Sequence, residues 1–224
     1  MSTLLLRFAA PMQSWGVSSR FTERSTGREP SKSGVIGLLA AALGRRRGEG
    51  IEDLNALRFG LRIDKAGVLL RDFHTAHAWE GRAARHSFVS ERHYLADALF
   101  LVGLEGDEEL LKLLDAALQS PAFPLYLGRR SCPPAGRLSL GLRDAPLEAA
   151  LRAAPRLAAD SPPLELVLDA ADGSILSRDL PLSFDPAQRR YGFRTSSRER
   201  LPILSTEQTD HDAMAAVTNR EENG

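Results

Sequence analysis

Two arginines stand side by side in a short segment, LYLGRRSCPPAGR (125–137), that also holds two glycines and two prolines. Proline removes a backbone N–H donor and glycine weakens regular structure, so this composition predicts a loop. A guanidinium presents several N–H donors in a planar fork that suits phosphate oxygens and base edges. Arg129 and Arg130 are therefore either solvated surface charges or donors to a nucleic acid, and Gly128 would let the backbone approach that ligand.

The charges along the chain support a basic binding face. The net charge is zero, with 29 basic and 29 acidic side chains, but residues 1–47 carry +6, residues 125–143 carry +4 and residues 189–200 carry +4. The acidic residues concentrate in 144–188 and after residue 201. Such alternation allows one basic face on a neutral molecule. Only three of the basic residues are lysines, a bias that fits phosphate recognition and that genome base composition also produces.

A second candidate is the segment GREPSKSG (27–34), which imitates a phosphate-binding loop before a helix. It lacks the glycine before the lysine and has no strand directly before it, so nucleotide hydrolysis is disfavoured. A helix N-terminus flanked by Arg28 and Lys32, with Ser33 beside them, would still attract the phosphates of a nucleic-acid backbone.

Four of the five histidines fall within twenty residues: His74, His77, His86 and His93. Their spacing offers no acid or cysteine in a familiar metal-ligand pattern, so no metal or other cofactor is expected. A metal-free ribonuclease can use a histidine to deprotonate a 2′-hydroxyl, which leaves that activity open. The remaining interpretation is a solvated hairpin whose histidines contact a partner.

Composition indicates a soluble protein with a sizeable core, since 43% of the 224 residues are hydrophobic. Arg7 interrupts the first apolar stretch, which argues against a signal peptide, and the longest apolar run (35–44) is about half of what a bilayer requires. The single cysteine, Cys132, excludes an intramolecular disulfide and favours a small buried side chain over a nucleophile. We therefore expect a cytoplasmic protein.

Hydrophobic periodicity indicates which elements position these residues. It predicts a strand (2–9), a helix that begins after Ser31 or Ser33 and ends before Gly44, strands at 61–64 and 67–75, a strand at 93–104, a helix at 107–120 and a strand at 137–142. This order is typical of an α+β ferredoxin-like (RRM-like) sheet backed by two helices. Residues 76–93 are polar and lack periodicity, and short strands are expected at 164–170, 178–184 and 189–204.

Four motifs, in this order and spacing, carry a resemblance to a known family: PMQSWG, TGREPSKSGVIGLLAAALG, RDFHTA and LYLGRRSCP. Together they resemble the CasD family of subunits of type I-E CRISPR Cascade complexes. The likeness is dense from residue 3 to about 143 and thin beyond it.

The resemblance implies a domain organisation and a set of partners. It implies a ferredoxin-like core (1–145) with a thumb inserted near 76–93, a β-rich extension (146–204) and a loosely ordered tail (205–224). Family members bind the 5′ handle of CRISPR RNA in antiviral defence, cap the row of backbone subunits and support the large subunit that reads target DNA. No membrane is involved.

These segments contain the candidate RNA-binding residues. They are Gln13, Trp15, Arg28, Lys32, Ser33, His74, Tyr126, Gly128, Arg129, Arg130 and Ser131. For Trp15, a core position is favoured over a stacking platform.

Two function classes remain for these residues. A related subunit of another subtype cleaves precursor RNA with a tyrosine and an adjacent Lys–His pair, whereas no lysine here neighbours a histidine. A non-catalytic RNA-binding subunit is therefore expected. A metal-independent endoribonuclease that processes CRISPR precursor RNA is the alternative, and a generic RNA-binding domain outside any complex is a third possibility.

Overall fold

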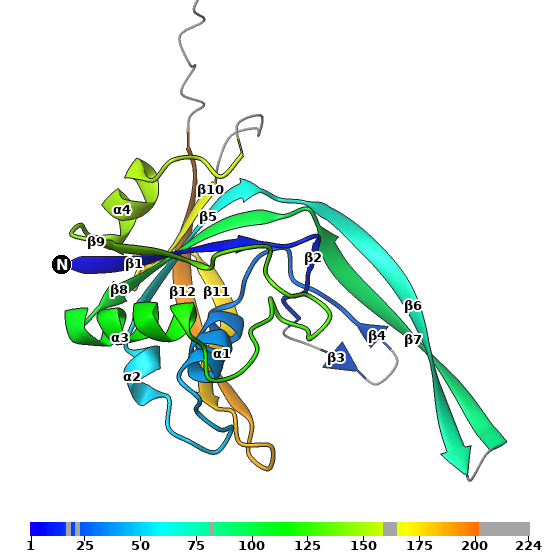
Figure 1. Cartoon of the computed structure of the whole chain (residues 1–224). Coiled ribbons are helices and arrows are strands. Elements are labelled where there is room, and N and C mark those ends of the chain that lie inside the picture. The colour runs from blue at the N-terminus through cyan, green and yellow to red at the C-terminus, as the bar shows by residue number, and fades with distance from the viewer. Residues whose placement is uncertain (17–18, 21–22, 81–82, 159–164, 202–224) are drawn as a thin grey trace, which may run out of the picture.

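The computed structural model describes residues 1–16, 19–20, 23–80, 83–158 and 165–201. The protein is a mixed α+β structure dominated by antiparallel sheet (Figure 1). The tail predicted at 205–224 lies outside the described residues.

A seven-stranded sheet forms the body of the molecule. Its order is β11-β12-β10-β5-β8-β1-β9, and all neighbouring strands in it are antiparallel. The strands are β1 (Ser2–Ala9), β5 (Arg58–Lys65), β8 (Leu99–Gly106), β9 (Ser139–Arg143), β10 (Glu165–Asp169), β11 (Ile175–Ser183) and β12 (Arg190–Arg200). The helices are α1 (Lys32–Ala42), α2 (Glu52–Asn55), α3 (Glu108–Gln119) and α4 (Leu147–Ala153).

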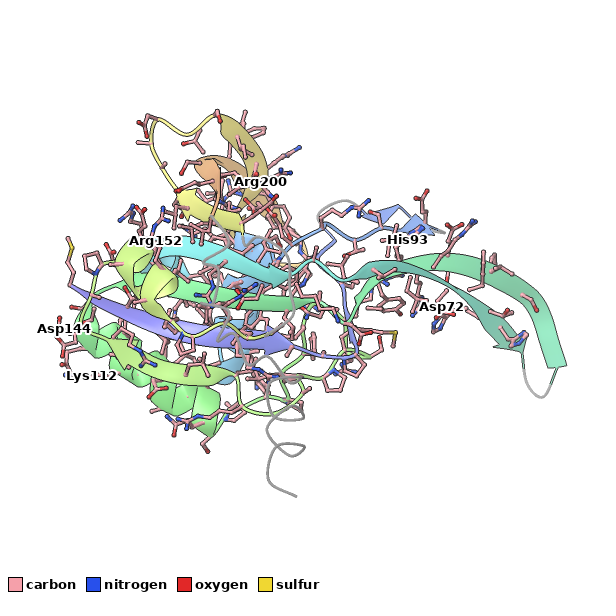
Figure 2. The ribbon with its side chains drawn as sticks, turned by 90° about the horizontal axis from the view of Figure 1, so that it is seen from above. Asp72, His93, Lys112, Asp144, Arg152 and Arg200 are labelled. Carbon is pink, nitrogen blue, oxygen red and sulfur yellow. The ribbon has the colours of Figure 1, made fainter. Side chains whose placement is uncertain are left out.

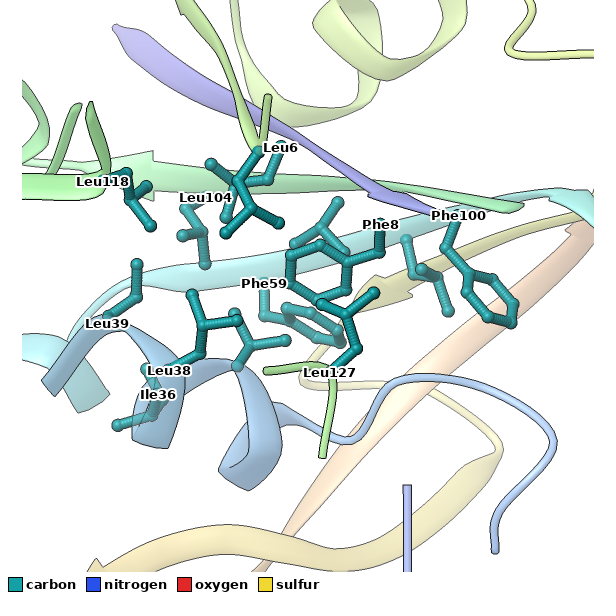
Figure 3. Close-up of a cluster of buried hydrophobic side chains, with 14 of the residues drawn as sticks. Leu6, Phe8, Ile36, Leu38, Leu39, Phe59, Phe100, Leu104, Leu118 and Leu127 are labelled. Carbon is teal, nitrogen blue, oxygen red and sulfur yellow. The ribbon is translucent and has the colours of Figure 1, made fainter. Parts of the chain in front are cut away.

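Helices cover both faces of this sheet, with α1 and α3 on one face and α4 on the other (Figure 1). Because successive side chains of a strand alternate, Leu6 and Phe8 of β1 enter the larger core while Leu5 packs with α4. Figure 3 shows the larger core, in which Leu39 of α1 and Leu118 of α3 approach the same strands.

A buried ion pair anchors the C-terminal end of α4 to the sheet. Arg62 of β5 is 1% exposed, and its guanidinium donates to the carboxylate of Asp64 at 2.7 Å and 2.9 Å. It also donates to the backbone carbonyls of Leu151, Ala154 and Pro155 at 2.6–2.8 Å. These partners satisfy a charge that would otherwise be costly to bury.

A long antiparallel hairpin, which we call the thumb hairpin (68–96), projects from the body (Figure 1). Its strands are β6 (Val68–Glu80) and β7 (Ala83–Ala96), and β7 also pairs with the short strands β2 (Met12–Gln13) and β4 (Glu23–Arg24), the latter paired with β3 (Ser19–Arg20). Figure 2 shows His93 nearer the body and Asp72 further out along the hairpin. Phe73 and Val89 are 58% and 57% exposed, so apolar side chains stand in solvent along it.

The C-terminal strands extend the same sheet, because β10 pairs with β5. A buried group of charges, the Arg194 cluster, ties them to α1: Lys32, Asp169, Asp179 and Arg194. Asp169 accepts from Lys32 Nζ and from Arg194 Nη1, both at 2.9 Å. Asp179 accepts from Arg194 Nε at 2.7 Å and from the backbone N–H of Lys32 at 2.8 Å. The four side chains are only 6–15% exposed.

Several sequence predictions are confirmed at this level. The first strand spans Ser2–Ala9, α1 begins after Ser31, and α3 follows the N-cap residue Asp107. The single strand predicted at 93–104 is wrong, since the chain turns at Asp97, which has a φ of 55°, and β7 and β8 are separate. α2 and α4 had no counterpart in the sequence prediction.

The described residues contain no helix that is both long enough and apolar enough to cross a membrane.

Candidate nucleic-acid interface

A cleft of about 1170 Å³ lies along α1, between the loop that follows α3 and the β11–β12 hairpin. Its lining comes from six separate parts of the chain: residues 14–16, β4, α1, the segment after α1, the 123–133 loop and the β11–β12 hairpin. The lining includes Arg24, Ser33, Gly34, Gly37, Ala41, Arg45, Arg46, Arg47, Phe123, Tyr126, Gly128, Arg129, Arg130, Phe184, Arg189 and Tyr191.

One face of α1 forms the floor of the cleft. Gly34, Gly37 and Ala41 recur at helical spacing, and because their side chains are absent or small, this face of the helix leaves room for the cleft. The helix begins at Lys32 because Ser31 caps it, with its Oγ accepting from the N–H of Gly34 at 3.2 Å. The N–H of Lys32 already donates to Asp179, so a carboxylate of the protein occupies part of the helix N-terminus where the sequence suggested a phosphate.

The loop predicted from its glycines and prolines forms one wall, and it is fixed to the body by its backbone. Leu127 N–H donates to Cys132 O at 2.8 Å, and Ser14 N–H donates to Leu127 O at 3.1 Å. Leu127 and Cys132 are buried, and burial raises the pKa of the Cys132 thiol. Gly128 has a φ of +89°, and a Cβ there would lie 1.6 Å from Ser14 O. The close approach that Gly128 permits is therefore to the protein itself.

The two adjacent arginines of this loop have different environments. Arg129 donates to the backbone carbonyls of Arg24 at 2.6 Å, His93 at 3.2 Å and Ser25 at 3.3 Å. Its guanidinium also lies 4.7 Å from the centre of the Tyr94 ring. Arg129 thus joins the loop to β4 and to the base of the thumb hairpin. Arg130 is exposed, and among the described residues it has no ion pair or hydrogen bond.

The cleft is strongly basic. Of the described residues that line it, seven are arginines and none is Asp, Glu, Lys or His. Arg45 is the one of these arginines whose charge is balanced in the described structure, by a two-pronged contact with Asp53 at 2.5 Å and 2.6 Å. The hydrogen bond between them raises the pKa of Arg45 and lowers the pKa of Asp53. A cleft with unbalanced guanidinium groups attracts polyanions.

Aromatic side chains stand on both walls of the cleft. Tyr126 on the loop and Tyr191 on β12 are half-buried, and Phe123 is 44% exposed. Nucleic-acid bases stack on such rings irrespective of their sequence. Arginines for phosphates and aromatic rings for bases are the two components that single-stranded RNA requires.

Three of the predicted RNA-binding residues are buried. Gln13 is fully buried, and its Nε2 donates to Ala98 O at 2.8 Å while its Oε1 accepts from Trp15 Nε1 at 3.1 Å. Trp15 is 2% exposed, stacks on Phe8 with ring centres 5.4 Å apart and contributes to the cleft lining beside Gly34. Lys32 is 5% exposed and belongs to the Arg194 cluster.

The other predicted residues lie at or near the surface. Ser33, Tyr126, Gly128, Arg129 and Arg130 line the cleft. Three residues are outside its lining: Arg28 and Ser131 are exposed, and His74 lies on the thumb hairpin with its Nε2 2.5 Å from Asp72.

Sequence reasoning did not single out the other end of the cleft, which residues 45–47, Phe184, Arg189 and Tyr191 line. The signals were visible as the RRR run at 45–47 and the RRY run at 189–191, within two of the basic segments. Only the fold brings them together. The described residues contain no group of three or more His, Cys, Asp and Glu side chains arranged for a metal ion.

Comparisons with known proteins agree on one family. The family model for CRISPR-associated protein (Cas_Cas5) matches residues 3–196. The chain is 36% identical over 159 residues to the CRISPR system Cascade subunit CasD of Escherichia coli (strain K12), which covers 62% of this chain and 70% of the relative.

Two solved structures are similar over most of the chain. A structure described as a Cas protein has 45% identity and a TM-score of 0.74, covering 89% of this chain and 95% of the other. A chain of a CRISPR RNA-guided surveillance complex has 36% identity and a TM-score of 0.76, covering 90% and 91%. The chain with this arginine-lined cleft therefore belongs to the CRISPR-associated Cas5 family.

Proposed function

We propose that this chain is a non-catalytic subunit of a Cascade surveillance complex that binds the 5′ handle of CRISPR RNA and caps the row of backbone subunits in antiviral defence. The observation that carries the proposal is the cleft of about 1170 Å³, whose described lining contains seven arginines and no acidic residue. The relative named Cascade subunit CasD and the similar chain of a surveillance complex support it. Such a role places the protein in the cytoplasm.

The strand order supports a ferredoxin-like core for residues 1–145. The strands β1, β5, β8 and β9 come first, second, third and fourth along the chain, and in space they lie in the order 4-1-3-2. α1 follows the first of them and α3 follows the third, which is the split βαβ arrangement. In this division the thumb is the hairpin 68–96 and the β-rich extension follows residue 145, with α4 at its start.

The exposed part of the cleft suggests how the predicted residues divide their roles. Tyr126, Arg130 and Ser33 face the ligand, with Arg28 and Ser131 beside the cleft. Gln13, Trp15 and Lys32 act from inside the protein, since each is held by partners of its own. Gly128 and Arg129 fix the loop against β4 and the thumb hairpin.

The chemistry of the cleft favours binding over cleavage. In the part of the chain that the structure describes, the ionisable side chains of its lining are those of arginine and tyrosine, which are poor general bases near neutral pH. His74, one of the four clustered histidines, pairs with Asp72 on the thumb hairpin and is outside the cleft lining.

The proposed partners of the thumb hairpin are the neighbouring subunits. Its exposed apolar side chains, among them Phe73 and Val89, would be buried by a backbone subunit. The large subunit would contact the complex nearby, which makes the link to target DNA indirect.

A co-expression experiment tests the proposal. The chain is produced together with its operon neighbours, and the purified assembly is sequenced for bound RNA. We expect an assembly whose RNA begins with one constant 5′ sequence. Recovery of the chain alone, or of an assembly with random RNA, contradicts the proposal.

An incubation with repeat RNA in EDTA tests the absence of catalysis. We expect intact RNA for the wild type and for His74→Ala. Cleavage by the wild type that disappears in His74→Ala establishes the endoribonuclease instead.

A further inference from the structure

The cleft continues beyond the 124–133 loop, past the C-terminal end of α1. We call this part the distal half and define it by Arg46, Arg47, Phe123, Arg189 and Tyr191. The proximal half contains Arg24 and the loop residues discussed above. The two halves share the α1 floor and differ in the segments that border them.

The arginines of the distal half are available to a ligand. The carboxylates near them act on Arg45, since Asp53 hydrogen-bonds to it and Glu49 and Glu52 also raise its pKa. Arg46 and Arg47 are exposed and have no hydrogen bond or ion pair from their side chains among the described residues.

Arg189 lies on the opposite side, in the turn between β11 and β12. It is also exposed and has no side-chain hydrogen bond or ion pair among the described residues. Guanidinium groups therefore face the cleft from both sides of the α1 terminus, and no described carboxylate neutralises them. Phosphates of a strand lying between them would be contacted from both walls.

Aromatic rings accompany these charges. Phe123 is held against α1, because its N–H donates to Ala41 O at 3.3 Å, yet its side chain is 44% exposed. Tyr191 is half-buried on β12, where it is paired with Pro181 of β11. Two fixed rings near unbalanced arginines suit the bases of a single strand, since stacking accepts any base.

The walls of the distal half are also fixed relative to each other. The Arg194 cluster joins β11 and β12 to the start of α1, and Phe184 packs over Gly37, where a Cβ would lie 3.7 Å from its ring. From Gly34 to Ala41 the floor runs seven residues, about 10 Å, the length of roughly three stacked nucleotides. The distal half begins where that stretch ends.

We propose that the distal half of the cleft binds a second stretch of the same single-stranded RNA, continuous with the stretch at the proximal half. This inference rests on the proposed function, because it assumes that the cleft holds RNA at all. It assigns phosphate contacts to Arg46, Arg47 and Arg189 and base stacking to Phe123 and Tyr191.

A length series tests it on the full chain. Binding of single-stranded oligouridylates of 3, 6 and 12 nucleotides is measured by fluorescence anisotropy for the wild type and for a distal triple variant, Arg46→Ala, Arg47→Ala and Arg189→Ala. The matched control is Arg137→Ala, Arg143→Ala and Arg178→Ala, which removes the same charge from exposed positions outside the cleft lining.

We expect the distal triple to weaken binding of the 12-nucleotide probe by about 10- to 100-fold, so that added length no longer increases affinity. The slope of log affinity against log salt should fall by about two, as for three lost contacts to a single strand. The control triple should change the affinity less than threefold. Melting temperatures should change little, because the three distal side chains are exposed and have no partner among the described residues, and the three control side chains are exposed as well.

Four outcomes overturn the inference. Equal effects of the distal and control triples show that the distal half does not touch RNA. A distal triple that binds RNA normally but loses a Cascade subunit in a pull-down makes the distal half a protein-docking surface. If the wild-type chain binds the 3-nucleotide probe through the proximal half, and binds it as tightly as the 12-nucleotide probe, only the second stretch of RNA is refuted. Failure to bind any probe refutes the proposed function as well.

Discussion

Cations have different surroundings in two neighbouring regions of this protein. In the Arg194 cluster, Lys32 and Arg194 each meet carboxylates at 2.7–2.9 Å, and all four side chains are nearly buried. In the cleft next to it, Arg46, Arg47 and Arg130 are exposed and have no carboxylate partner among the described residues. α1 takes part in both regions.

The difference indicates which charges hold the fold and which bind a ligand. A buried cation requires a partner inside the protein, and its loss leaves an uncompensated opposite charge. An exposed guanidinium contributes little to stability and keeps its donors available. The comparison therefore predicts that stability and RNA affinity depend on separate sets of residues.

The largest effect on stability is expected from Arg194→Ala. This variant leaves Asp169 and Asp179 buried with one cation between them, which should lower the free energy of unfolding by about 3–5 kcal/mol. Burial alone would lower the pKa of Arg194, but the hydrogen bonds to Asp179 and Asp169 and their negative charges together outweigh burial and raise that pKa, which agrees with a strongly held charge.

Urea unfolding of the full chain measures the effect of Arg194→Ala, with Arg178→Ala as the matched control on the same hairpin. Arg178 is exposed and should change stability by less than about 0.5 kcal/mol. Equal losses of unfolding free energy in the two variants would contradict the assignment of stability to the buried charges.

Lys32 shows what the sequence can and cannot reveal. Its place beside Ser31 and Ser33 correctly predicts a helix start, because capping depends on near neighbours in the chain. Its partner Asp169 is 137 residues away, so no local pattern distinguishes a buried ion pair from a phosphate contact. For the same reason, no local pattern shows that Arg46 and Arg189 line one cleft, because only the fold brings them together.

The thumb hairpin illustrates a second limit. Residues 76–93 lack periodicity in the sequence, yet the structure places 76–80 in β6 and 83–93 in β7. Strand periodicity arises when one face is buried, and here exposed apolar residues such as Phe73 and Val89 occur on a hairpin that projects into solvent. The core strand 2–9, which is buried, was correctly predicted.

The second largest effect should come from Gly128→Ala, with Gly136→Ala as its control. Both glycines have a positive φ, at +89° and +82°, but a Cβ on Gly136 meets nothing closer than 3.8 Å. The control should therefore show the conformational cost alone, about 1–2 kcal/mol. At Gly128 the contact with Ser14 O adds to it, for a total of about 2–4 kcal/mol.

Thermal unfolding and RNA binding of the two glycine variants are measured together. We expect Gly128→Ala to lose RNA affinity as well, since the loop that carries Arg130 must shift. If both variants lose the same stability, the loop is not packed against Ser14 as the structure describes.

The adjacent arginines Arg129 and Arg130 should separate the two roles within one loop. Arg129→Ala removes donors to three backbone carbonyls and should cost about 1–3 kcal/mol of stability. Arg130→Ala should leave stability within about 0.5 kcal/mol and reduce the salt slope of RNA binding by about 0.7. Denaturant unfolding and anisotropy titrations at several salt concentrations measure both quantities, and the reverse assignment would show that Arg130 is the structural residue.

The smallest effect is expected from Asp53→Asn. This substitution tests the comparison between paired and unpaired cations most directly, because it removes the carboxylate partner of one arginine. Asp53→Asn removes the carboxylate that holds Arg45 at the rim of the cleft. The hydrogen bond from Arg45 lowers the pKa of Asp53, so this pair stabilises the fold above the unfolded pKa of about 4 and the contribution disappears as the pH falls through the lowered value. Because Asp53 is 42% exposed, the loss at pH 7 should be below about 1 kcal/mol.

RNA binding by Asp53→Asn should change in the opposite direction. Arg45 becomes available to the ligand, so affinity should rise about two- to fivefold and the salt slope should steepen by about 0.7. Glu148→Gln is the matched control, because it removes a carboxylate that pairs with Arg152 outside the cleft lining and should leave RNA affinity unchanged. Anisotropy titrations at pH 7 compare the two variants with the wild type. Weaker binding by Asp53→Asn would mean that the Arg45–Asp53 pair shapes the cleft, and that balanced charges contribute to binding as well as to the fold.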